Sequence, residues 1–189
     1  MAGSILTKQA IAKSLKELSQ TKPFDKISIG DISENCNINR QTFYYHFQDK
    51  YVLLKWIYMN DILIPNMSDL SFDNWNTKLL DAMRVMYEDK AFYINTIKHA
   101  GNYINQYLLE NAEVFFSRAI DVLDQNSHIN IEERKFFAKF FSYGLCGMIT
   151  EWVTDEMKTD PKVMTSYMKK LLDSCEKAAY NHKVGVLDI

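Results

Sequence analysis

The stretch NRQTFYYHFQDK, residues 39–50, places four aromatic rings and one histidine at the consecutive positions 43–47. Aromatic side chains bury large areas in a small core, but a short helix turns only one face inward. Phe43 and Phe47 are four residues apart and therefore share a face, which we expect to be buried. The other rings must then point toward solvent, where a binding partner can reach them.

The residues before this stretch predict a second short helix and a tight turn. Ser28 can cap a helix over residues 29–36 with its side-chain oxygen. Asn37 follows, and asparagine tolerates the left-handed conformation that a tight turn needs. Asn39 can then cap the next helix, over residues 40–47. Two short helices joined in this way form a helix-turn-helix, whose second helix enters the major groove of DNA.

The exposed arc of this second helix carries side chains that suit contacts with DNA. They are Arg40, Gln41, Thr42, Tyr44, Tyr45 and His46. Glutamine pairs with adenine, arginine pairs with guanine, and the threonine methyl contacts the thymine methyl. Tyrosine hydroxyls commonly reach phosphate oxygens, and Lys50 adds a positive charge at the start of the following helix. The pattern leaves an alternative open, in which the two tyrosines are partly buried in a small bundle and Arg40 is a solvated surface charge.

The rest of the chain is also helical in pattern. The 189 residues include only six glycines and three prolines, so few of the turn-forming residues that hairpins need are present. We expect nine helices, over residues 4–20, 29–36, 40–47, 49–64, 72–88, 91–99, 102–126, 131–156 and 161–181. Pro65 should end the fourth helix, and Gly101 should separate the sixth from the seventh. The prediction is an all-α fold, with a three-helix head over residues 1–64 and a larger helical bundle over residues 65–189.

The run DISENCNINRQTFYYHFQDKYVLL, residues 31–54, resembles the DNA-binding signature of the TetR family of bacterial transcriptional regulators. The positions that carry the resemblance are Phe24, Ile27, Ile32, Thr42-Phe43-Tyr44, His46-Phe47, Lys50 and Leu53-Leu54. The resemblance covers about the first 60 residues. It implies base or phosphate contacts from the exposed arc named above, and phosphate contacts from Lys50 and from the helix start at Ser28.

Two residues depart from the family pattern. Asn37 occupies a turn position where the family most often has glycine, and asparagine can adopt the same conformation. Gly30 occupies a position where some members have a basic residue, so we expect that phosphate contact to be missing.

The middle of the chain is rich in aromatic and methionine side chains, which more often form plain core than a ligand site. In the family that the head resembles, the middle helices enclose an effector site. The resemblance therefore makes Trp75, Tyr93, His99, Tyr103 and Tyr107 candidates to line such a pocket. Tyrosine and histidine could hold a small polar ligand between apolar walls.

The last two helices predict a subunit interface. Apolar and small residues recur along both at spacings of three or four, as in Phe137, Phe141, Gly144, Leu145, Met148 and Trp152, and in Met164, Met168, Leu171 and Cys175. A helix that is apolar nearly all round must be covered on two sides, and a partner subunit can supply the second cover. The resemblance implies the same homodimer, and two heads then match a roughly palindromic operator. The segment GLCGMITEWV, residues 144–153, resembles a branch of the family that includes activators of dihydroxyacetone kinase operons.

Composition limits the class of protein. The chain has 22 basic and 24 acidic residues, but residues 1–50 hold seven basic against five acidic, so the head is the end that would face phosphate. Three widely spaced cysteines indicate neither a disulfide framework nor a zinc cluster, and no apolar run reaches the ~20 residues that span a bilayer. We expect a cytoplasmic protein without metal or cofactor.

No catalytic arrangement of side chains is visible, so we do not expect an enzyme. The sequence predicts a homodimeric, sequence-specific regulator that binds an operator in double-stranded DNA and responds to a small-molecule or protein effector. It leaves open the operator, the effector and the sign of regulation. The alternative is a helical protein–protein interaction module that has lost DNA binding, which Gly30 and the mild basic excess favour.

Overall fold

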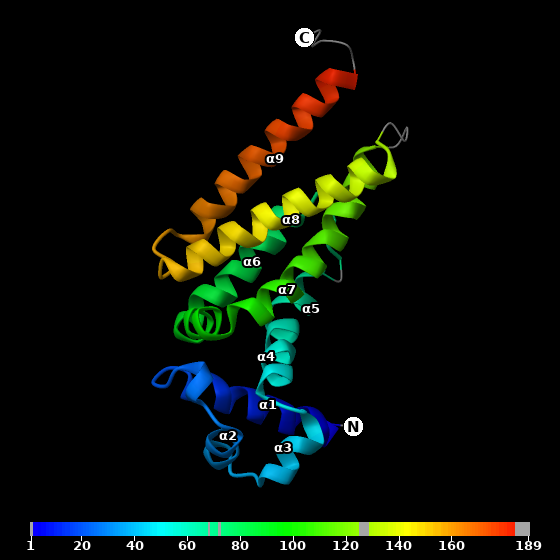
Figure 1. The fold of residues 1–189 in the computed structure, drawn as a ribbon. Helices are drawn as coiled ribbons and strands as arrows, with labels where there is room; N and C mark the ends of the chain where they lie inside the picture. The colour runs from blue at the N-terminus through cyan, green and yellow to red at the C-terminus, as the bar shows by residue number, and fades with distance from the viewer. Residues whose placement is uncertain (1, 68, 72, 125–128, 184–189) are drawn as a thin grey trace.

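A computed structural model describes residues 2–67, 69–71, 73–124 and 129–183, and every regular element in these ranges is helical. The elements are α1 (Ala2–Leu18), the 3₁₀ turn η1 (Phe24–Lys26), α2 (Ile29–Asn35), α3 (Arg40–His46), α4 (Lys50–Tyr58), the π turn η2 (Met59–Leu63), α5 (Ile64–Met67), α6 (Trp75–Glu88), α7 (Lys90–Leu123), α8 (Ile131–Thr154) and α9 (Pro161–Lys183). Helices α1 to α3 form one end of an elongated molecule, and α8 and α9 reach its other end (Figure 1). The predicted all-α class is confirmed.

The helix that leaves the head does not stop at Pro65. Helix α4 continues through the π turn into α5, and the amide of Ile64 donates to the Met59 carbonyl, five residues back. Pro65 is then the second residue of α5, directly after the π turn. This helical run crosses position 64, where we placed the boundary between head and bundle, and that division stays a prediction.

The predicted helices over residues 91–99 and 102–126 form the single helix α7. The break that we placed at Gly101 is a kink, since Ala100 has φ −140° and ψ 17° while its neighbours are helical. A glycine inside a helix costs only about 1 kcal/mol relative to alanine, so packing on both sides can keep the helix continuous. With α4, η2 and α5 taken as one run and α7 as one helix, the described residues form eight helices where we expected nine.

One hydrophobic core joins the head to the body. Ile11, Leu15, Ile32 and Phe43 of the head belong to the same buried cluster as Phe92, on α7. Polar contacts reinforce this junction. The side chain of Asn95 accepts from the Phe24 amide at 2.8 Å and donates to the carbonyl oxygens of Ser19, at 2.6 Å, and Lys22, at 2.8 Å.

An ion-pair triad crosses the same junction. The ammonium of Lys16, on α1, lies 2.7 Å from a carboxylate oxygen of Asp61 and 2.8 Å from one of Asp89. Asp61 belongs to the π turn, and Asp89 lies between α6 and α7. The triad therefore ties the first helix of the head to two parts of the body.

The last two helices differ in how they pack. Helix α8 lies along α7, whereas α9 packs beside α6 and then diverges from α8 (Figure 1). Two left-handed residues, Glu156 and Met157, turn the chain between them. Within the described ranges, no helix is both long enough and apolar enough to cross a bilayer.

Candidate nucleic-acid interface and ligand cavity

Helix α2 begins at a capping box. The Ser28 hydroxyl accepts from the Asp31 amide, and the Asp31 carboxylate accepts from the Ser28 amide at 2.7 Å. The Lys22 ammonium lies 2.7 Å from the same carboxylate and, with these hydrogen bonds, holds the Asp31 pKa well below its usual range. The Ser28 hydroxyl also donates to this carboxylate, so it is engaged within the head.

The turn between α2 and α3 has the geometry that the sequence predicts. Asn37 has φ 54°, in the left-handed region, and it is the residue that stands where the family most often has glycine. The Asn39 side chain accepts from the Thr42 amide at 2.7 Å and so caps α3. It also accepts from the Thr42 hydroxyl, which leaves the threonine methyl as the part of that side chain that can contact a base.

Two rings turn inward, Phe43 on α3 and Phe47 at the extended residue that caps its end, while Tyr44 and Tyr45 on α3 point outward. Phe43 and Phe47 are buried against the head core, as predicted. Tyr44 is 56% exposed and Tyr45 is 82% exposed, so the alternative in which both are partly buried is wrong for Tyr45. His46 is half-buried and lies edge-on to the Tyr45 ring. An exposed aromatic on a rigid, capped helix is available to a partner because its position is already fixed.

Arg40 occupies the space that Gly30 leaves open. A β-carbon added at Gly30 would lie 2.5 Å from the Nη2 atom of Arg40, so the guanidinium lies directly over this glycine. The groove between the starts of α2 and α3 is lined by both residues. A cationic group therefore stands at the position where we expected a missing phosphate contact. Gly30 was one of two features that favoured loss of DNA binding, and the mild basic excess was the other.

Lys50 is committed to the head itself. Its ammonium donates to the carbonyl oxygens of Phe24, Asp25 and Ile27 at 2.9, 3.0 and 2.8 Å. These bonds use all three of its N–H donors, and burial lowers its pKa. The Lys50 ammonium is thus engaged within the head, and its contact with phosphate stays a prediction. Its role is to hold the 3₁₀ turn against α4.

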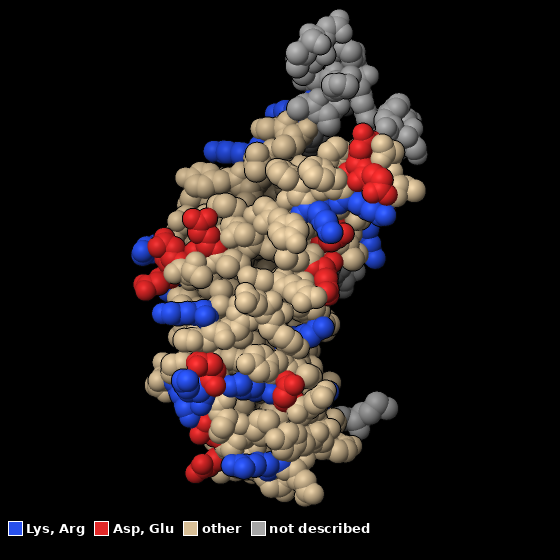
Figure 2. All heavy atoms as spheres, in the orientation of Figure 1, with Lys and Arg blue, Asp and Glu red and all other residues tan. Residues whose placement is uncertain are grey.

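Charge is sparse at the reading end of the head. Figure 2 shows mostly uncharged surface at the end of the molecule that α2 and α3 form, with basic and acidic side chains side by side above it. Affinity for DNA from this face must therefore come from few cationic contacts, with hydrogen bonds and ring contacts from α3.

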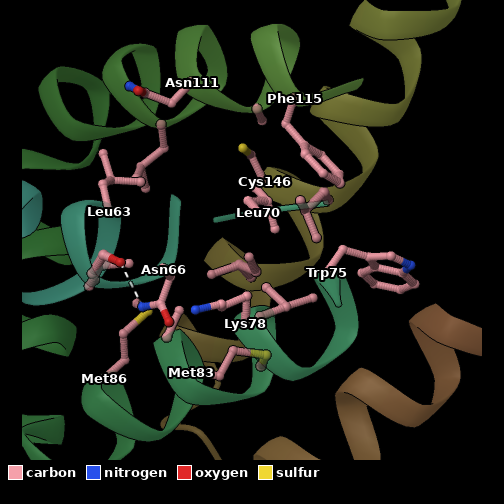
Figure 3. Close-up of a pocket in the computed structure, with 17 residues that line it drawn as sticks. Leu63, Asn66, Leu70, Trp75, Lys78, Met83, Met86, Asn111, Phe115 and Cys146 are labelled. Carbon is pink, nitrogen blue, oxygen red and sulfur yellow. Dashed lines mark hydrogen bonds between the residues drawn. The ribbon is translucent and has the colours of Figure 1, made fainter. Parts of the chain in front are cut away.

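A cavity of about 150 Å³ lies in the body between α5, α6, α7 and α8 (Figure 3). Its wall is almost wholly apolar. The lining residues are Ile62, Leu63, Asn66, Leu70, Trp75, Lys78, Leu79, Ala82, Met83, Met86, Leu108, Asn111, Ala112, Phe115, Leu145, Cys146 and Ile149. The position of the cavity next to the π turn makes it the candidate ligand site of the body.

Only Trp75 of the five predicted pocket residues lines this cavity. Tyr93 is fully buried beside Tyr58, and its hydroxyl donates to Asp61. His99 pairs with Asp25 at 3.4 Å, near the head.

The two remaining candidates also belong to the junction. Tyr103 packs against the ring of Tyr51 at 5.4 Å between centroids. The Tyr107 hydroxyl contacts the sulfur of Met59, and the Lys55 ammonium lies 4.1 Å from the ring centroid. Tyr93, His99, Tyr103 and Tyr107 therefore do not line this cavity, and these polar aromatics make other contacts instead.

The sequence contained no distinctive signal for the true lining. Met83, Met86, Leu108 and Phe115 follow helical spacing like any core residue, and nothing local separates a wall from a filled core. A cavity is defined by the space between helices that are distant in the chain.

The predicted subunit interface divides between two faces of α8. Trp152 is buried, stacks on Tyr87 and donates to the Thr159 carbonyl at 2.7 Å. Phe141 stacks on Phe116, and Leu145 lines the cavity. Trp152 therefore packs inside the subunit, while Phe141 and Leu145 are partly buried, and their place in a subunit interface stays a prediction.

The outer face of α8 and α9 carries large exposed apolar side chains. They are Phe136, Phe137, Phe140, Tyr143 and Met148 on α8, and Val163, Tyr167 and Leu171 on α9. Gly144 and Gly147 lie on the outer side of α8 with open space around them. Met164, Met168 and Cys175 are half-buried on α9. Figure 2 shows a broad uncharged area over α8.

Comparison with known proteins agrees with the helix-turn-helix and the helical body. Residues 11–57 match the family of bacterial regulatory proteins named tetR, and residues 73–174 match the C-terminal region of transcriptional regulators of the same type. The chain belongs to the TetR family, and it is a DNA-binding transcription regulator under effector control.

Among its relatives is the HTH-type dhaKLM operon transcriptional activator DhaS of Lactococcus lactis subsp. lactis (strain IL1403), which is 30% identical over 154 residues, or 80% of this chain and 81% of that protein. The solved structure of a dihydroxyacetone kinase operon activator DhaS is similar, with a TM-score of 0.72 and 28% identity over 92% of this chain and 98% of that one. NalD, the secondary repressor of the MexAB-OprM multidrug efflux pump in Pseudomonas aeruginosa, shares the fold at 17% identity, with a TM-score of 0.59 over 92% of this chain and 97% of that one.

Proposed function

We propose that this chain acts as a homodimer, reads a two-fold operator with α3, and changes its affinity for that operator when an effector fills the cavity of the body. The observation that carries the proposal is the outward arc of α3, where Gln41 and Tyr45 are exposed on a helix held by an Asn39 cap. Side chains fixed in this way lose little entropy when they contact DNA.

Each residue of the arc has a role that suits its chemistry. Gln41 and Arg40 are the proposed base readers, because their amide and guanidinium groups make paired hydrogen bonds. The Thr42 methyl contacts a thymine methyl, and the hydroxyls of Tyr44 and Tyr45 donate to phosphate oxygens. His46 and the helix start at Ser28 flank these contacts.

The subunits meet through the exposed apolar faces of α8 and α9. Phe140, for example, is 65% exposed and Leu171 is 63% exposed. Side chains of this size are rarely gathered on a monomer surface, and a self-complementary face suits a two-fold pair. The glycines at 144 and 147 let a partner helix approach closely.

The π turn supplies a route from cavity to head. Ile62 and Leu63 line the cavity, and the preceding residue, Asp61, pairs with Lys16 of α1. A ligand that binds one arrangement of this turn better than another shifts the head between two positions, and so changes the spacing of the two recognition helices.

A relative supports a proposal for the genes that this chain regulates. The DhaS protein of L. lactis is described as an activator of the dhaKLM operon, and it aligns with most of this chain. We propose that this chain likewise activates an operon of the dihydroxyacetone kinase type. A reporter fused to the promoter of such an operon should gain expression with the wild-type chain and lose it with Gln41→Ala.

Fluorescence anisotropy on duplexes from upstream of the gene and its neighbouring operons tests operator binding. Specific binding should exceed binding to a scrambled duplex by ~10³ or more and weaken as salt rises. Gln41→Ala should lose ~1–3 kcal/mol of that binding free energy, whereas the matched change Gln106→Ala, at an exposed position of α7, should leave it unchanged. Equal binding of wild type and Gln41→Ala would remove α3 as the reading helix.

Sedimentation of the purified chain tests the dimer. Phe140→Asp should convert dimer to monomer, because it places a charge in the centre of the proposed interface. Leu6→Asp is the control, since Leu6 is 65% exposed on α1, at the other end of the molecule. A dimer that survives Phe140→Asp would place the interface elsewhere.

A further inference from the structure

The cavity of the body has a chemistry that restricts its ligand. Met83, Met86, Leu108, Phe115 and Ile149 form its wall together with other aliphatic side chains, and polar atoms contribute almost nothing to the exposed lining. A ligand inside would therefore exchange water for carbon on nearly every side.

Three polar residues at the cavity each already make one hydrogen bond or ion pair. The Asn66 amide donates to the Ile62 carbonyl at 2.7 Å (Figure 3), and the Asn111 amide donates to the Tyr107 carbonyl at 2.7 Å. The Lys78 ammonium pairs with Asp69 at 2.6 Å. A ligand with several hydroxyls would lose its hydrogen bonds to water and find few replacements, which is unfavourable because a buried polar group without a partner is costly.

Charge is also unfavourable in this cavity. A carboxylate or phosphate would have to compete with Asp69 for Lys78, which is the cation that lines the site. The Cys146 side chain lines the cavity as well, and burial raises the pKa of its thiol to about 11, so the thiol stays neutral at physiological pH. The cavity therefore presents no anion and no unpaired cation among its described lining residues.

The volume sets the size of the ligand. A cavity of about 150 Å³ matches an engineered apolar cavity of about that volume in another protein, which stays dry and binds benzene. The cavity is only partly enclosed, so longer chains or fused ring systems would extend out of this apolar space toward solvent.

We infer that this cavity takes a compact, uncharged, mainly apolar molecule of about six to ten non-hydrogen atoms, such as a small aromatic or alicyclic compound. Polyols, trioses and sugar phosphates are poor ligands for it. The inference rests on the proposed function, because it names the effector class of the same site.

Titration calorimetry of the full chain, without DNA, tests the inference with toluene as the probe and glycerol, dihydroxyacetone and butyrate as comparisons. Toluene should bind with a Kd on the order of 0.1–1 mM, while the three polar compounds should show no heat of binding at the same concentrations.

Two variants locate the binding. Ala112→Leu fills part of the cavity and should weaken toluene binding by ~10-fold or more. Ala91→Leu makes the same change at an exposed position of the same helix and should leave binding within ~2-fold of wild type. Toluene binding that Ala112→Leu does not alter would place the ligand outside the cavity and overturn the inference.

An enlarged cavity gives a result that misfolding cannot imitate. Phe115→Leu removes a ring from the wall and should shift the preference from toluene toward naphthalene by ~10-fold. No shift would show that Phe115 does not limit the ligand and would overturn the assigned size.

The outcomes separate this inference from the proposed function. If the chain binds its operator specifically but binds dihydroxyacetone or glycerol more tightly than toluene, the ligand class is wrong and the regulator stands. If toluene binds in the cavity but no duplex is preferred over a scrambled one, the ligand class holds and the proposed function fails.

Discussion

Replacing Lys16 with methionine should destabilise the fold by about 2–3 kcal/mol. The Lys16 ammonium makes two charge-assisted contacts, at 2.7 Å to Asp61 and 2.8 Å to Asp89. Removing one partner of a buried ion pair costs about 3–5 kcal/mol because the other charge is left without a counterion. The three side chains are 25%, 28% and 26% exposed, so water can partly solvate the two carboxylates, and we expect a cost below that range. Methionine keeps a flexible side chain of similar length but loses the ammonium, which also lies 5.3 Å from the Phe92 ring centroid and 5.8 Å from that of Tyr93.

Urea denaturation followed by far-ultraviolet circular dichroism measures the effect, at one protein concentration because a dimer's stability depends on concentration. Lys13→Met is the matched control. Lys13 is 78% exposed and lies 3.7 Å from Glu17, so its removal should change the unfolding free energy by less than ~0.5 kcal/mol. Equal stabilities of Lys16→Met and Lys13→Met would refute the role of the triad. Adding Asp89→Asn to Lys16→Met should recover part of the loss, because it removes one of the two facing carboxylates.

The pH dependence gives a second check on the same residue. Burial alone would lower the pKa of the Lys16 ammonium. The contacts with Asp61 and Asp89 together outweigh burial and raise this pKa above its ordinary value. A raised pKa means that the contribution to stability is fully present below the unfolded-state pKa, and is lost as pH rises through the folded-state pKa. The difference between wild type and Lys16→Met should therefore be constant from about pH 6 to 9 and shrink only above about pH 10.5.

Three further predictions concern the head. Gly30→Ala should keep stability or raise it by up to ~1 kcal/mol, and the new β-carbon should displace the Arg40 guanidinium. Operator affinity, measured by fluorescence anisotropy, should then change by ~10-fold. An unchanged affinity would show that Arg40 makes no DNA contact from this position. Asp31→Asn should lower the free energy of unfolding at pH 7, and this difference from wild type should narrow as pH falls below about 4. The reason is that the depressed pKa of Asp31 gives stability that is present above the unfolded-state pKa and is lost in acid. Urea titrations at several pH values would contradict this if the difference stayed constant. Asn37 has φ 54°, so Asn37→Gly should be tolerated while Asn37→Ala should lower the free energy of unfolding by ~1 kcal/mol. Thermal unfolding measures both variants. Equal destabilisation by glycine and alanine would show that the left-handed turn is not the reason.

The head could be derived from its sequence because its signals are local. The spacing of Phe43 and Phe47 settles which face of α3 is buried, and both rings are buried in the structure. Ser28 and Asn39 cap the helices that follow them, and Asn37 adopts the left-handed turn. Each of these features depends on residues within four positions in the chain, so no knowledge of distant packing was needed.

The same reasoning failed where a side chain chooses between distant partners. Lys50 could have faced phosphate, yet its ammonium meets three carbonyl oxygens of the 3₁₀ turn, more than twenty residues earlier in the chain. The sequence shows that residue 93 is a tyrosine, but it does not show that this side chain is buried between the head and the body. A polar group on a long side chain satisfies whichever partner the tertiary fold brings within reach.

By itself, the sequence determined the helical class, the helix-turn-helix and the outward arc of α3, because helical periodicity and capping act over a few residues. Only the tertiary structure decided the cavity, the Lys16 triad and the division of α8 into an inner face with Trp152 and an outer face with Phe140. Both faces of α8 are apolar, so periodicity cannot choose between them. The choice follows from where α7 packs, and that is a property of the whole fold.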